Sequence, residues 1–183
     1  MKRNVLIFGI VLGSIITGNM IYMVNEVCSN PEMQTNDIVG YAAMLVVFSL
    51  TFFGTRNYRN KELNGFISFG HAFKVGALIA LVGSTIYVGV WMFYYYLFVP
   101  DFIDQYSLHV LRDAAKEGAT EAELSTRTKE LADFKEMYKN PLFILLSSYA
   151  EVLPIGLAVA LVSALALRKK PNQELPEALE ATK

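Results

Sequence analysis

Apolar residues are gathered in four long runs, and nearly all charged residues lie between or after them. Residues 4–25, 38–55 and 75–99 hold no charged side chain, and residues 141–167 hold one, Glu151. A helix needs about 20 mainly apolar residues to cross a bilayer, and these runs are apolar on every face. The pattern predicts an all-α membrane protein with four transmembrane helices over these ranges.

The longest polar stretch between the runs, residues 101–139, predicts two short amphipathic helices. Apolar residues of the first recur at every third or fourth position: Ile103, Tyr106, Val110 and Ala114. The second starts at a capping-box pattern of Thr120 and Glu123. Its apolar face consists of Leu124, Leu131, Phe134 and Tyr138. With a turn at Gly118, the two form a helical hairpin between the third and fourth membrane helices.

Basic residues lie at alternate ends of the four runs. Lys2 and Arg3 precede the first run, residues 56–74 carry four Lys or Arg against one acid, and residues 168–170 are all basic. Residues 25–37 contain acids and no Lys or Arg. By the positive-inside rule, both termini are cytoplasmic and the hairpin is extracytoplasmic.

Composition narrows the classes of function. The net charge is −1, so no basic field attracts nucleic acid. Cys28 is the single cysteine, which excludes an intramolecular disulfide and a cysteine-based zinc site. His71 and His109 fall on opposite sides of the membrane in this topology. We find no motif for catalysis, for a cofactor or for a metal, and expect no enzyme activity.

The chain ends in a polar, proline-bearing stretch. Residues 171–183 have the composition of a disordered segment, here a cytoplasmic tail. Residues 1–170 are then predicted to be a single four-helix transmembrane domain.

Small residues recur at four-residue spacing within the membrane helices. Such rows let helix backbones approach closely in lipid. The rows consist of Gly9 and Gly13; of Ala72, Gly76, Ala80 and Ser84; and of Gly156, Ala160 and Ala164. They predict helix–helix seams within the bundle, or alternatively a homodimer surface.

Aromatic residues crowd the outer part of the third run. They are Trp91, Tyr94, Tyr95, Tyr96 and Phe98. One interpretation is a belt at the headgroups of the bilayer, and the other is a cluster that stacks on a ligand.

Glu151 is the candidate functional residue, because intramembrane acids often mark function. It lies about 15 Å into the fourth run by helical rise, near the bilayer centre. We expect it to be protonated or to be held by hydroxyls at comparable depth: Ser14, Thr17, Ser84, Thr85 and Tyr87. It either makes a structural interhelical hydrogen bond or binds a proton or cation.

The sequence resembles a bacterial membrane family known as domain of unknown function 4199. The resemblance is carried by these segments: Phe52-Phe53-Gly54, Ile67-Ser68-Phe69-Gly70, Pro100-Asp101-Phe102, residues 134–143, and Glu151 with Pro154. It covers residues from about 5 to 170. It implies a multi-pass protein of the bacterial inner membrane with no assigned activity, and a neighbouring glycosyltransferase as an envelope-sugar partner.

Three hypotheses of function follow. The first is a non-enzymatic accessory or scaffold subunit of an envelope assembly, in contact with the lipid bilayer and with a second copy or another membrane protein. The second is a small proton- or cation-coupled transporter that uses Glu151. The third is a membrane enzyme or glycosyltransferase accessory that acts on lipid-linked sugar.

Overall fold

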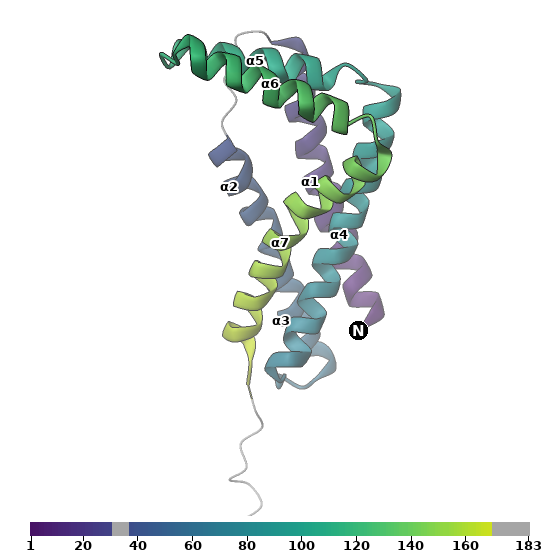
Figure 1. Ribbon diagram of the computed structural model, residues 1–183. Helices are drawn as coiled ribbons and strands as arrows, with labels where there is room; N and C mark the ends of the chain where they lie inside the picture. The colour runs from purple at the N-terminus through teal and green to yellow at the C-terminus, as the bar shows by residue number, and fades with distance from the viewer. Residues whose placement is uncertain (31–36, 170–183) are drawn as a thin grey trace, which may run out of the picture.

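Helices make up nearly all of the protein that the computed structural model describes, residues 1–30 and 37–169 (Figure 1). Within this part, four helices are long and apolar enough to cross a membrane: Lys2–Ser29, Val39–Glu62, Phe69–Leu97 and Pro141–Leu167. The first, third and fourth are α1, α4 and α7. The predicted all-α membrane protein with four spanning helices is confirmed at this level, whereas the predicted tail, residues 171–183, lies outside the described residues.

The second spanning helix is interrupted, which the sequence did not predict. It consists of α2 (Asp37–Phe48) and α3 (Leu50–Glu62). At the junction the Ser49 hydroxyl donates a hydrogen bond to the Val46 carbonyl at 2.6 Å. A serine that bonds to its own helix in this way competes with the regular backbone ladder, which accounts for the break.

Two predicted boundaries differ from the structure for a common reason. The second span continues to Glu62 instead of ending at 55, and the third begins at Phe69 instead of 75. Charged residues marked these predicted ends, but long basic side chains such as Arg59 can follow a helix and reach water at its end. The start of α4 is fixed by Ser68, whose hydroxyl accepts a hydrogen bond from the backbone N–H of His71.

The rows of small residues form helix–helix seams within the chain, as the first interpretation predicts. A Cβ on Gly9 would lie 2.6 Å from Cγ1 of Val82, so α1 and α4 touch there. A Cβ on Gly156 would lie 2.6 Å from the Phe48 ring and 2.8 Å from Cβ of Ala80. These contacts join α7 to both α2 and α4. The rows are therefore used in packing the monomer.

Helices α5 (Phe102–Lys116) and α6 (Glu121–Met137) lie across one end of the bundle, between α4 and α7 in sequence (Figure 1). The chain leaves α4 ahead of Pro100, which disfavours helical geometry in the residue before it. Gly118, with a φ of +88°, makes the turn between the two helices. The capping box at Thr120 and Glu123 is present. The four predicted apolar positions, three in α6 and Tyr138 directly after it, are less exposed than the rest of this helix.

Two contacts tie this pair of helices to the bundle and to each other. The Nε2 atom of buried His109 lies 2.8 Å from the Val27 carbonyl at the end of α1. Lys135 of α6 forms an ion pair with Asp104 of α5. The two helices thereby have a fixed position over the ends of the spanning helices.

The segments that carry the basic residues between and after the apolar runs meet at the opposite end of the bundle. The start of α1, the end of α3, the start of α4 and the end of α7 all lie there (Figure 1). Arg59 of α3 donates to the Leu167 carbonyl at 3.1 Å, and the backbones of Ile67 and Lys169 pair in a short antiparallel bridge. The basic residues that the sequence placed on one side of the membrane are therefore neighbours in space.

Candidate functional site

A pocket of about 460 Å³ lies between α5, α6 and the adjoining ends of the spanning helices. This volume is typical of small-molecule sites. Its lining comes from α1, α2, α4, α5, α6 and α7, and from Tyr138 directly after α6. The lining residues are Met20, Val24, Tyr41, Tyr87, Trp91, Phe102, Ile103, Tyr106, Phe134, Tyr138, Ser147, Ser148 and Glu151. Segments far apart in sequence thus build one site.

Aromatic rings make up more than half of this lining. Trp91 meets Phe102 edge to face, with ring centroids 5.2 Å apart, and the rings of Phe134 and Tyr138 are 5.0 Å apart. The indole N–H of Trp91 donates to the Tyr138 hydroxyl at 3.1 Å. Because both of these side chains are buried, this bond fixes the wall where α4 meets the end of α6.

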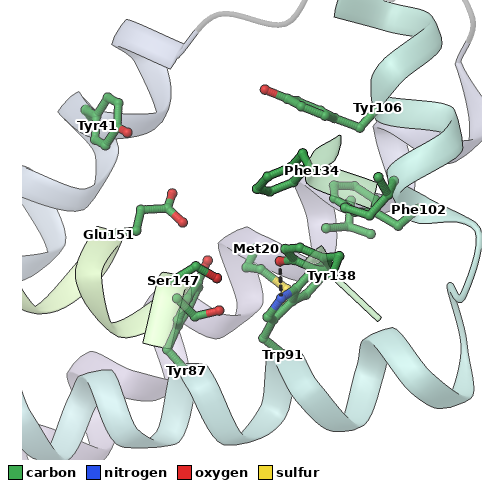
Figure 2. Close-up of a pocket in the computed structure, with 13 residues that line it drawn as sticks. Met20, Tyr41, Tyr87, Trp91, Phe102, Tyr106, Phe134, Tyr138, Ser147 and Glu151 are labelled. Carbon is green, nitrogen blue, oxygen red and sulfur yellow. Dashed lines mark hydrogen bonds between the residues drawn. The ribbon is translucent and has the colours of Figure 1, made fainter. Parts of the chain in front are cut away.

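Glu151 lies in the third turn of α7 and borders this pocket. Figure 2 shows its carboxylate pointing toward the space that Tyr41, Phe134 and Ser147 surround. Among the described residues that line the pocket, Glu151 is the one charged side chain. The candidate residue chosen from its charge therefore faces a cavity and a set of aromatic rings.

The structure brings Glu151 together with one of the hydroxyls expected at its depth. Tyr87 lines the same pocket. Ser84 and Thr17 are buried outside the lining, and Thr85 accepts a hydrogen bond from Tyr149 at 2.9 Å. Ser147 and Ser148, one turn before Glu151 on α7, also line this pocket.

Burial keeps the phenol of Tyr138 uncharged. Loss of solvent raises its pKa from 10.0 to about 12, and the negative charge of Glu151 adds to this, while the hydrogen bond from Trp91 opposes it. At neutral pH the Tyr138 phenol is therefore uncharged, and Glu151 is the acidic side chain of the described lining.

The pocket is open on one side and closed toward the basic end. Tyr41 and Glu151 are both exposed, so the space between α2 and α7 communicates with the surroundings. Further along α7, Phe48 is fully buried against Gly156 and Ala80. This contact brings α2 and α7 together beneath the pocket.

The aromatic residues at the end of α4 support both interpretations made from the sequence, each for different rings. Trp91 is 5% exposed and lines the pocket. Tyr96 and Phe98 are 46% and 64% exposed and point away from the bundle. The exposed rings suit a bilayer interface, and the buried ring belongs to the site.

Most of the aromatic wall was missed from sequence. The overlooked residues are Tyr41, Phe102, Tyr106, Phe134 and Tyr138. Phe134 and Tyr138 were placed on one apolar face of a helix, which is the available signal. Their meeting with α2 and α7 depends on how the helices fold over the bundle.

The two histidines lie apart, at opposite ends of the bundle. His71 Nε2 is 3.4 Å from the Tyr58 hydroxyl, whereas His109 contacts the end of α1. Within residues 1–30 and 37–169, no three His, Cys, Asp or Glu side chains are grouped so that they could hold a metal ion.

A known protein family matches most of this chain. A family model described as a protein of unknown function (DUF4199) matches residues 5–169. No curated protein and no solved structure matches the chain.

Proposed function

Because this chain belongs to the DUF4199 family, whose description assigns no role, the pocket is the best guide to function, and we propose that the protein binds a small amphiphilic ligand there. It acts as a non-enzymatic accessory subunit in a bacterial inner membrane, with both termini cytoplasmic and with α5 and α6 outside. A second copy or another membrane protein completes the assembly.

The observation that carries the proposal is an open, aromatic-lined pocket of about 460 Å³ with one carboxylate directed into it. Ligand sites are concave and mostly apolar, with a few polar groups that fix orientation. Glu151 lies about 15 Å along α7, within its apolar part. A ligand that reaches it needs an apolar portion as well as a polar one.

Transport is the less favoured alternative. Glu151 faces a pocket, as a transporter would need, but the contact of Phe48 with Gly156 closes the bundle below it. Passage would require α2 and α7 to separate. Binding requires no such movement, so it is the simpler use of this geometry.

The chain has a single tryptophan, Trp91, which lines the pocket, so its fluorescence can report binding. The protein would be reconstituted in lipid nanodiscs and titrated with phenyltrimethylammonium, tert-butylbenzene, phenyl glucoside and benzenesulfonate. Saturable binding of at least one probe is expected. The variant Ser147→Phe, which fills the pocket, should abolish it, and Ala150→Phe, at an exposed position of the same helix, should not. Absence of saturable binding, or equal loss in both variants, would refute the proposal.

A further inference from the structure

The chemistry of the pocket also indicates which amphiphile it takes. We propose that the ligand is an organic cation carrying an ammonium group, with Glu151 as its counter-ion and the aromatic rings around the cationic head. This inference rests on the proposed function and names its ligand class.

Charge is the first argument. The described lining contributes one acidic side chain and no Lys, Arg or His. The nearby base Lys135 is paired with Asp104 outside the lining. A carboxylate in an apolar setting gains most from an opposite charge at close range, because the low dielectric screens the attraction little. The pocket therefore attracts cations and repels anions.

The rings are the second argument. The face of an aromatic ring is negative, so Trp, Tyr and Phe attract a cation placed over them, and Trp does so best. Figure 2 shows Tyr41, Phe134 and Trp91 on different sides of the space into which the Glu151 carboxylate points. Rings on several sides together with one carboxylate match the needs of an alkylated ammonium head.

Pocket size and ligand count argue against calcium as the bound cation. Calcium takes six to eight oxygen ligands at close range. The described lining offers one carboxylate, the hydroxyls of Ser147 and Ser148, and phenols, spread around a space of about 460 Å³. An organic head fills this space and needs no such coordination shell.

The test compares two probes of nearly the same shape. Phenyltrimethylammonium and tert-butylbenzene differ in one atom, nitrogen or carbon, and therefore in charge. In nanodiscs of a neutral glycolipid, which carries neither an ammonium group nor a net charge, Trp91 fluorescence should show at least about tenfold tighter binding of the cation, which corresponds to about 1.4 kcal/mol. Glu151→Gln should remove this preference, and Glu151→Asp should retain most of it.

Glu117→Gln is the matched control, since it removes one carboxylate at the exposed end of α5, outside the pocket. It should leave the preference unchanged. Equal affinity for both probes, tighter binding of phenyl glucoside, or equal effects of Glu151→Gln and Glu117→Gln would overturn the cation assignment. In those cases saturable binding that Ser147→Phe blocks would still support the proposed function.

A last comparison distinguishes the source of the ammonium group. If it belongs to a lipid headgroup, nanodiscs that contain phosphatidylethanolamine will compete, and the probe will bind at least about tenfold more weakly there. If it belongs to a free cation, both lipids will give the same affinity. Either result supports an ammonium site.

Discussion

Trp91 connects the packing of the site to its chemistry. Its indole N–H bonds to Tyr138, and its ring touches Phe102 of α5 at a centroid distance of 5.2 Å. A residue of a spanning helix is thereby joined to both helices that cover the bundle end. Movement of α5 or α6 would change the surroundings of Trp91, so its emission reports the integrity of the pocket as well as its occupancy.

Tyr138 gives a prediction for pH at the same scale. Burial raises its pKa to about 12 in the folded protein, against 10.0 for a free phenol. Because the folded state holds this proton more tightly, the stabilising contribution is fully present below pH 10 and is lost as the pH rises toward 12.

The comparison of wild type with Tyr138→Phe tests this prediction. The difference in their free energies of unfolding, measured in mixed micelles, should be constant below pH 10 and should shrink above it. All other tyrosines are common to the two proteins. A difference that falls already between pH 8 and 9 would contradict a raised pKa.

At the scale of single elements, the start of α6 depends on its capping box. The Thr120 hydroxyl accepts from the backbone N–H of Glu123, and the Glu123 carboxylate accepts from Thr120. Thr120→Ala should lower the stability of the first turn by about 1 kcal/mol, seen as faster amide exchange in residues 121–124. Probe binding should not change, because α6 meets the pocket at its far end. Slower binding or weaker affinity would mean that the whole helix has moved.

This cap also depends on pH. The two hydrogen bonds from Thr120 lower the pKa of the Glu123 carboxyl below 4.5. The stabilisation is therefore present above pH 4.5 and is lost as the pH falls through the lowered value. Amide protection in the first turn should follow this course in the wild type and not in Glu123→Gln.

The packing of α2 against α7 gives a prediction at one glycine. In Gly156→Ala the new Cβ would meet the Phe48 ring at 2.6 Å and Ala80 at 2.8 Å, so the helices must shift. Such overpacking costs about 1 to 3 kcal/mol. Gly89→Ala is the control, because it meets nothing within 4 Å on the exposed face of α4. Thermal unfolding should occur at a lower temperature in Gly156→Ala alone, and equal melting of the two variants would refute a tight seam.

The elements themselves could largely be predicted, because they follow from local patterns. The fourth span, residues 141–167, has the predicted bounds, since Asn140 caps it and Pro141 suits its first turn. The break at Ser49 was missed because a serine within an apolar run carries no sign of which carbonyl it will bond. Whether a segment is helical follows from its residue pattern, whereas the carbonyl that the Ser49 hydroxyl bonds to depends on the exact geometry of one turn.

At the scale of the whole molecule, the site was predicted only in part. Glu151 could be found because a charge within an apolar run is costly and visible in one sequence. Its neighbours could not, because Tyr41, Trp91 and Phe134 come from different helices. No periodicity within one helix shows which ring of another will face it. The pocket depends on α5 and α6 folding back over the bundle.

The orientation in the membrane is the remaining prediction for the whole molecule. Basic residues gather at the end opposite α5 and α6, so the positive-inside rule places that end in the cytoplasm. Single cysteines at Ser125 and Asn60, both exposed, would be introduced into a Cys28→Ser background. A membrane-impermeant maleimide applied to spheroplasts should label Ser125→Cys in α6 and not Asn60→Cys in α3. Both should react after the membrane is opened with detergent. Labelling of Asn60→Cys alone in intact spheroplasts would invert the topology, and the pocket would then open from the cytoplasmic side.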